Sequence, residues 1–176
     1  SISTNSYEGV YDGKDHAVYS PEALIVGGMG LCDGHYFDYL SYTEIKNVIS
    51  DGVNKIGFEI VDEYGEIVDL NNYDITYDWG TVNISKRSLT ISTNSYNGVY
   101  DGKYHTDPEI FALGNGENTG LCEGHIIEVL YAPSFRDVIE NAENIVEFRV
   151  VNEYGEEIDL SNYDITYDWG TVNISK

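Results

Sequence analysis

The chain contains two copies of one sequence unit, and this duplication limits what it can fold into more than any other feature. The segment NYDITYDWGTVNISK at residues 72–86 returns unchanged at residues 162–176. Near the start of each copy, ISTNSY at residues 2–7 returns at residues 91–96. A repeat of this length indicates two copies of one folding unit. Such units are more often beads of a repetitive array than enzymes, because an enzyme usually needs a larger scaffold around a single pocket.

The register of the copies places their boundary between Lys86 and Arg87. No Gly/Ser-rich or Pro-rich linker separates the copies, and only residues 86–88 join two strand-like segments. This pattern predicts a short, stiff junction rather than a flexible tether. We therefore expect two modules, residues 1–86 and residues 87–176, arranged end to end.

Composition is compatible with two small acidic domains, each long enough for one modest core. The chain carries 31 acidic and 9 basic residues, a net charge of −22. This charge repels nucleic acid and anionic membranes, so we exclude both as partners. Two interpretations stay open: solubility with mutual repulsion between neighbouring surface chains, and attraction of divalent cations or basic proteins. No stretch has the length of a transmembrane helix, so we expect no membrane insertion.

Short runs of alternating apolar and polar residues, separated by turn residues, predict a mainly β fold. Strand candidates in the first copy are residues 2–6, 36–42 and 56–62, with an apolar stretch at 17–26; their counterparts are residues 89–95, 126–131, 145–152 and 109–113. The clearest local signal is a closing hairpin, in which residues 75–77 and 82–84 flank a turn at residues 78–80. We expect each module to be a β-sandwich or a β-grasp-like sheet with at most one short helix.

One segment is ambiguous between helix and strand. Ile45, Val48 and Ile49 have the i, i+3, i+4 spacing of a helix face, and residues 138–142 have a similar pattern. In the second copy, a serine three residues before Asp137 makes a plausible N-cap. The pattern is therefore compatible with a helix of one or two turns that covers one face of a sheet.

Taken in order, these motifs resemble the MBG-type repeats of large bacterial cell-surface proteins, which are often described as adhesins. The matching positions are residues 11–14, His16, Gly30, Leu31, Gly34, 72–77 and 80–84, and in the second copy 100–103, His105, Gly120, Leu121, Gly124, 162–167 and 170–174. The resemblance covers both copies nearly end to end, and its closing Asn-Tyr-x-Ile-Thr-Tyr-x-x-Gly-Thr motif is the most specific part. It implies a secreted, cell-wall-associated, non-enzymatic array domain of Gram-positive bacteria, without catalytic residues. The segment before residue 56 departs from the family, which usually has Asp-Val-Gly-Thr-Tyr there.

The two cysteines occupy equivalent positions in the copies. In modules arranged end to end, Cys32 and Cys122 would lie too far apart for a disulfide, so we expect both to be thiols in buried apolar sites. His35 and His125 follow them as Cys-x-x-His. Zinc needs at least three protein ligands, and each copy offers only one further histidine, so we expect no metal site. A Cys–His nucleophile would also need an oxyanion-donor motif nearby, so we expect no catalytic residues.

The remaining candidate residues are acidic loops and aromatic side chains. The acidic loops at residues 12–15 and 62–66 lack the spacing of a calcium loop, so a solvated acidic face is preferred to bound calcium. Recurring tyrosines within strand patterns predict core roles, although exposed rings would suit sugars or a protein partner. These are Tyr7, Tyr11, Tyr64, Tyr73 and Tyr77, with Tyr96, Tyr100, Tyr154, Tyr163 and Tyr167. Trp79 and Trp169, at the predicted turn tips, are the candidate ligand contacts.

Together these patterns predict a non-enzymatic repeat region of a secreted bacterial surface protein. We expect a stalk or adhesive array module without cofactors, extracellular and cell-wall associated, monomeric within a longer repeat-containing chain. A host protein or a glycan is the expected partner. The chain does not begin with Met, and we expect it to be a piece of a larger or processed protein. The alternative is a carbohydrate-binding module of a secreted multidomain enzyme, which three coplanar exposed aromatic rings would favour.

Overall fold

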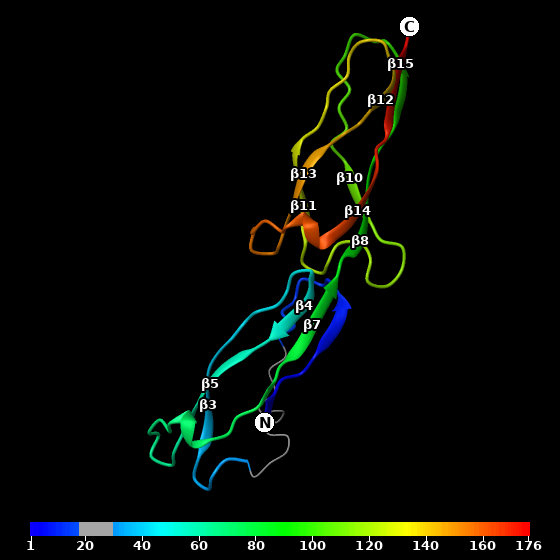
Figure 1. The fold of residues 1–176 in the computed structure, drawn as a ribbon. Coiled ribbons are helices and arrows are strands. Elements are labelled where there is room, and N and C mark those ends of the chain that lie inside the picture. Colours follow the sequence, from blue (N-terminus) through cyan, green and yellow to red (C-terminus); the bar gives the residue numbers. More distant parts are fainter. Residues whose placement is uncertain (18–29) are drawn as a thin grey trace. The chain divides into compact units, whose positions relative to one another are not determined.

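The computed structural model describes residues 1–17 and 30–176, which divide into two compact units, Ser1–Ser85 and Lys86–Lys176 (Figure 1). We call them unit 1 and unit 2. Both are mainly β, as predicted, and no helix in the described residues reaches seven residues. Most of the apolar stretch predicted at residues 17–26 lies outside the described residues. Its counterpart in unit 2 forms strand β10 (Ile110–Leu113).

The described part of unit 1 forms three small sheets. Its elements are β1 (Ile2–Ser3), β2 (Tyr7–Val10), β3 (Tyr36–Tyr42), β4 (Ile49–Asn54), β5 (Ile56–Val61), the 3-10 turn η2 (Leu70–Asn72), β6 (Tyr77–Asp78) and β7 (Gly80–Ser85). Strand β7 lies between β2 and β4, β3 pairs with β5, and β1 pairs with β6. Strand β3 has the bounds that the alternating pattern predicts.

Unit 2 repeats this arrangement with longer strands in one sheet. Its elements, besides β10, are β8 (Arg87–Thr93), β9 (Tyr96–Val99), β11 (Ile126–Tyr131), β12 (Ile139–Glu143), β13 (Glu147–Val151), the 3-10 turn η3 (Leu160–Asn162), β14 (Tyr163–Asp168) and β15 (Thr171–Ser175). Strand β8 lies between β10 and β14, β15 lies between β12 and β9, and β11 pairs with β13.

The hairpin predicted at the end of each copy is wrong. Strands β6 and β7 follow each other in the chain, yet they belong to different sheets. Strand β6 runs parallel to β1, with Tyr77 opposite Ile2, and β7 runs parallel to β2, with Val82 opposite Tyr7. Strands β14 and β15 pair with β8 and β9 in the same way. The first and last segments of each unit therefore run side by side and change sheets together.

A close backbone crossing explains why the closing segments change sheets. A Cβ atom on Gly80 would collide with the backbone carbonyl of Asn5, so only glycine fits at this point. Thr4 Oγ1 accepts a hydrogen bond from Gly80 N at 2.9 Å and ties the crossing together. Unit 2 repeats this bond between Thr93 and Gly170 at 3.0 Å. The distant strand supplies backbone hydrogen-bond partners in place of a local hairpin: β6 pairs with β1 at Tyr77 and Asp78, and β14 pairs with β8 from Tyr163 to Asp168.

The short helix that the spacing at residues 45–49 and 138–142 allowed is also wrong. The chain there leads into β4 and β12, which pair antiparallel with β7 and β15. Both strands contain a register shift, at which Asp51 and Asn141 have φ values of 54° and 55°. Asp and Asn tolerate this left-handed conformation better than most residues. Asp51 N also donates to Asn83 Oδ1 at 2.7 Å, which holds the bulge against β7.

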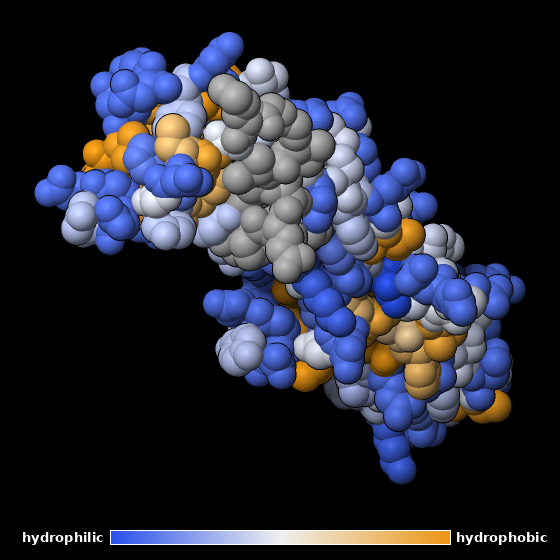
Figure 2. Space-filling view, turned by 90° about the horizontal axis from the view of Figure 1, so that it is seen from below, coloured by the Kyte–Doolittle hydropathy of each residue, from blue (hydrophilic) through white to orange (hydrophobic). Residues whose placement is uncertain are grey.

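Each unit has its own core. In unit 1, Ile2 and Ile56 are buried against the half-buried side chains of Phe37, Tyr39, Phe58, Ile75 and Trp79. In unit 2, the most deeply buried side chains include Leu89, Ile91, Val146, Val150 and Ile174. Apolar residues left at the surface form separate patches between hydrophilic residues over much of the visible face (Figure 2). Burial within each unit follows the alternation of the strands.

The tyrosines divide between core and surface. Tyr11 and Tyr163 are buried, as predicted. The predicted core role is wrong for Tyr64, Tyr77, Tyr100, Tyr154 and Tyr167, which are exposed. Tyr64 and Tyr154 lie in tight turns that reverse the chain after β5 and β13, where no second layer covers them. Surface tyrosines are therefore available as contacts.

Candidate functional site

The predicted contacts Trp79 and Trp169 lie where the chain passes between sheets. Both indoles are half-buried. Trp79 stacks on Tyr77, with ring centroids 5.2 Å apart and planes inclined by 27°. Trp169 stacks on Tyr167 at 5.1 Å and 19°. Each unit therefore carries the same Tyr–Trp pair, in which one indole face is already occupied by a protein side chain.

A shallow hollow lies beside the Tyr–Trp pair of unit 1. It has a volume of about 350 Å³, and its lining includes Lys55, Phe58, Leu70, Tyr77 and Trp79. Phe58 and Tyr77 are tilted neighbours with centroids 6.4 Å apart. An aromatic wall with one lysine suits a small ligand that has an apolar face. In unit 2 the residue equivalent to Lys55 is Ile145, so the lysine beside the Tyr–Trp pair is particular to unit 1.

The Cys-x-x-His segments form turns held by a distant tyrosine hydroxyl. Tyr73 Oη accepts a hydrogen bond from Cys32 N at 3.1 Å and lies 2.6 Å from His35 Nδ1. Tyr163 contacts Cys122 N and His125 Nδ1 in the same way, at 3.1 and 2.7 Å. Each motif thus uses the cysteine backbone and the imidazole ring to bind the start of the closing segment.

Both cysteines are thiols, as predicted, but their environments differ. Cys122 is buried, whereas the prediction of a buried site is wrong for Cys32, which is exposed. The turn holds Cys32 through its backbone, and this role does not require burial of the sulfur. Burial, together with the charge of Arg87, lowers the pKa of His125. The Nδ1 atom of a neutral His125 can accept a hydrogen bond from the Tyr163 hydroxyl.

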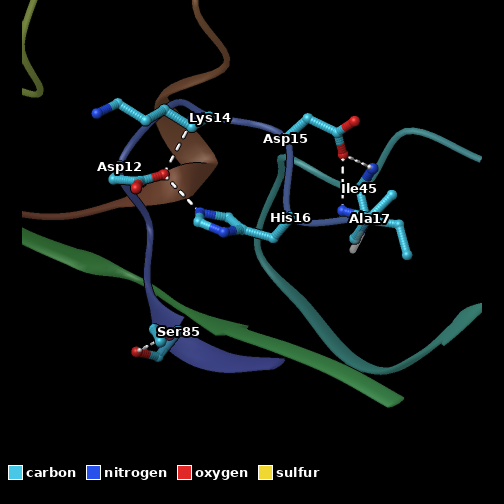
Figure 3. Close-up of polar contacts among 8 residues, drawn as sticks. Asp12, Lys14, Asp15, His16, Ala17, Ile45 and Ser85 are labelled. Carbon is cyan, nitrogen blue, oxygen red and sulfur yellow. Dashed lines mark hydrogen bonds and ion pairs between the residues drawn. The ribbon is translucent and has the colours of Figure 1, made fainter. Parts of the chain in front are cut away.

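The Tyr-Asp-Gly-Lys-x-His motif forms a compact polar cluster in each unit. Asp12 Oδ1 accepts hydrogen bonds from Lys14 N at 2.9 Å and from His16 Nε2 at 2.8 Å (Figure 3). The His16 ring stacks on Tyr7 with centroids 3.9 Å apart. Burial by itself would raise the pKa of Asp12, but these two hydrogen bonds and the nearby positive charges lower it overall. The positive φ of Gly13, 78°, lets the chain close the turn.

The same contacts recur around Asp101, at 2.9 Å from Lys103 N and 3.0 Å from His105 Nε2. Other acidic loop residues also serve the backbone. Asp15 Oδ1 accepts from Ala17 N and from Ile45 N (Figure 3). These carboxylates fix turns, and across residues 1–17 and 30–176 no three His, Cys, Asp or Glu side chains are grouped to hold a metal.

The chain matches no protein-family model, no curated protein and no solved structure. In the part of the chain that the structure describes, no helix has the length and apolar character needed to cross a membrane.

Sequence patterns missed the role of the two tyrosines that hold the turns. Tyr73 and Tyr163 each lie 41 residues after the cysteine whose backbone they bind. This separation is the same in both copies, and a contact that both modules need requires both copies to retain the cysteine segment and the tyrosine. The shared pair was therefore a signal that the sequence offered. The structure brings Cys32, His35 and Tyr73 together, whereas Trp79 stacks on Tyr77 instead.

Proposed function

We propose that this chain is a non-enzymatic repeat region of a bacterial cell-surface protein, which acts as a stalk or adhesive array module. The observation that carries the proposal is the use of the same reactive side chains for the same structural contacts in both units. Asp12 and Asp101 each close a turn, and Tyr73 and Tyr163 each hold a Cys-x-x-His turn. These carboxylates bind the backbone, and the histidines bind carboxylate or tyrosine side chains of the same module, so both residue types hold the module's own turns. This use supports a structural role for them rather than a catalytic one.

Net charge and the resemblance to MBG-type repeats support the same proposal. A charge of −22 keeps densely displayed copies apart and soluble. Parallel pairing of the first and last segments of each unit ties both ends of the module into its sheets. Such a module resists being pulled from its ends, because its terminal strands must separate before it unfolds. We place it outside the cell, attached to the wall, with a host protein or glycan as partner.

A binding experiment on the full chain tests this proposal. Arrays of matrix proteins and glycans are probed in calcium and in EDTA, with wild type and the double variant Trp79→Phe/Trp169→Phe, which keeps aromatic cores. Saturable binding that weakens in the double variant supports an adhesive module. The absence of binding in both calcium and EDTA supports a stalk. Hydrolase turnover that disappears in a Cys32→Ala/Cys122→Ala variant would overturn the proposal.

The alternative, a carbohydrate-binding module of a secreted enzyme, has one observation in its favour. The hollow beside Trp79 combines aromatic rings with Lys55. However, Tyr77 and Trp79 are stacked face to face rather than set side by side in one plane. A flat polysaccharide chain needs coplanar rings along its length, and a stacked pair presents a single outer face. Binding to insoluble polysaccharide that depends on Trp79 would favour this alternative.

A further inference from the structure

A second hollow lies in unit 2, around the Tyr-Asp-Gly-Lys-x-His segment. It has a volume of about 310 Å³, at the small end of ligand pockets. Its lining includes Asn94, Tyr96, Tyr104, His105, Asp107 and Phe135. Aromatic rings and hydrogen-bonding groups therefore converge on one small concave site.

The polar groups of the hollow are held in place by other side chains. Asn94 Nδ2 donates to Asp107 Oδ2 and to Glu109 Oε2, each at 3.0 Å. Asp107 Oδ1 also accepts from Glu109 N at 3.0 Å. The imidazole of His105 stacks on Tyr96 with centroids 4.5 Å apart. A ligand would meet oriented acceptors and a fixed ring, which reduces the entropy lost on binding.

Tyr104 is the residue that distinguishes this hollow from the equivalent place in unit 1. Its side chain is 69% exposed, and the Arg136 guanidinium lies 5.5 Å from its ring centroid. The corresponding residue of unit 1 is Asp15, whose carboxylate accepts from the backbone N of Ile45 (Figure 3). In unit 2, Phe135 N donates instead to the carbonyl of His105 at 3.0 Å. In unit 2 a backbone carbonyl therefore accepts the hydrogen bond that the Asp15 carboxylate accepts in unit 1. Position 104 does not need a carboxylate, and it carries an aromatic ring at the rim of the hollow.

The chemistry of the lining selects the class of ligand. Asp107 in the lining disfavours an anion, as do the nearby Glu109, which accepts from Asn94, and the overall charge. A cationic ligand is also disfavoured, because the Arg136 guanidinium already lies over the Tyr104 ring and would repel a second positive charge there. A purely apolar ligand would leave the Asn94 and Asp107 groups without water or a replacement partner. A neutral ligand with hydroxyl groups and one apolar face meets every requirement.

We propose that this hollow of unit 2 binds a single neutral pyranose residue of a glycan. The apolar face of the sugar ring would lie on Tyr104, and its hydroxyl groups would donate to Asp107. This site is distinct from Trp79 and Trp169. It rests on the adhesive form of the proposed function, which it deepens by naming a sugar residue as the ligand and unit 2 as the place where it binds.

The test is a titration of the isotope-labelled full chain followed by NMR. The probes are glucose, galactose, mannose and N-acetylglucosamine, with N-acetyl-arginine amide as a cationic probe. At least one sugar should shift the amide signals of Tyr104, His105 and Asp107 saturably. Tyr104→Asp, which installs the residue found in unit 1, should weaken binding about tenfold, the value of one aromatic stacking contact. Tyr104→Phe should keep most of the affinity, because it keeps the ring.

Tyr154→Ala is the matched control, since Tyr154 is 80% exposed in the same unit and does not line the hollow. It should bind the sugar as wild type does. The inference is overturned if no sugar shifts these signals, if only the arginine probe does, or if Tyr104→Asp binds as tightly as wild type. Those results would leave the stalk role standing, whereas cysteine-dependent turnover would remove the proposed function and leave the sugar site untouched.

Discussion

Replacing Thr93 by valine tests whether one buried hydroxyl holds the backbone crossing of unit 2. Thr93 is 8% exposed, and its Oγ1 donates to Asn144 O at 2.8 Å and accepts from Gly170 N at 3.0 Å. Valine has nearly the same shape, so the substitution removes two hydrogen bonds without opening a cavity. Each buried backbone group left without a partner costs about 1–3 kcal/mol. We expect the free energy of unfolding of unit 2 to fall by about 2–4 kcal/mol.

Tryptophan fluorescence reports each unit separately, because each contains one tryptophan. In a Trp79→Phe background, urea unfolding followed at Trp169 gives the stability of unit 2, and the slope with urea should stay constant. Thr4→Val in a Trp169→Phe background is the matched control. Thr4 makes the same two contacts, at 2.5 and 2.9 Å, but it is only half-buried. Water can replace its hydroxyl there, so we expect a loss of about 1 kcal/mol.

Two outcomes would refute this reasoning. A loss below about 0.5 kcal/mol for Thr93→Val would mean that the crossing does not depend on its hydroxyl. A loss for Thr4→Val as large as that for Thr93→Val would mean that burial does not set the cost. In the first case the parallel pairing of strands β14 and β15 with β8 and β9 would need another cause, and in the second the difference in burial between Thr4 and Thr93 would have no energetic consequence.

Three other substitutions probe the crossing, the Asp-Gly turn and the Cys-x-x-His turn. Gly170→Ala should destabilise unit 2 by about 3 kcal/mol or more, because its Cβ would collide with the carbonyl of Asn94. Thermal unfolding checks this against Gly155→Ala, whose Cβ meets open space and whose only cost is the φ of 78°, so that variant should lose about 1–2 kcal/mol. The pKa of Asp12 is lowered in the folded state, so the stability it contributes is present above the unfolded value of about 3.9 and is lost as the pH falls through the folded pKa. Wild type and Asp12→Asn should therefore converge in urea midpoint below about pH 4, and a constant difference would contradict this. Tyr163→Phe should cost about 1–3 kcal/mol, since it removes the hydroxyl that accepts from Cys122 N; an unchanged urea midpoint would show that the turn does not need it.

Most strands were predictable because their signal is local. Strands β3 and β11 have the bounds that alternation predicts, since one face of each lies toward the core of its unit. The Asp-Gly turns were equally readable, because Gly13 must adopt a positive φ and Asp12 bonds the backbone two residues on. The closing hairpin was the strongest local signal and the wrong one. Its two arms each prefer a partner from the start of the unit, and nothing in their own sequence indicates that preference.

The candidate sites were less predictable than the strands. Trp79 was identified from its place in a turn pattern, but its stacking on Tyr77 depends on the strand that passes between sheets. The hollow around Tyr104 combines residues 94–96 at the start of β9, residues 104–107 of the following loop, and the distant residues Phe135, Asn144 and Val172. A concave surface built from such separate segments has no signature in any one of them.

The sequence by itself determined the number of units, their β character, their acidic surface and the turns at each Asp-Gly pair. Each of these depends on composition or on neighbours within a few residues. Only the tertiary structure decided that the first and last strands of each unit run parallel, that Tyr73 and Tyr163 hold the Cys-x-x-His turns, and that position 104 lies at the rim of a hollow. These features depend on contacts between residues from about thirty to nearly eighty positions apart, whose free energy depends on geometry that exists only once the chain has folded.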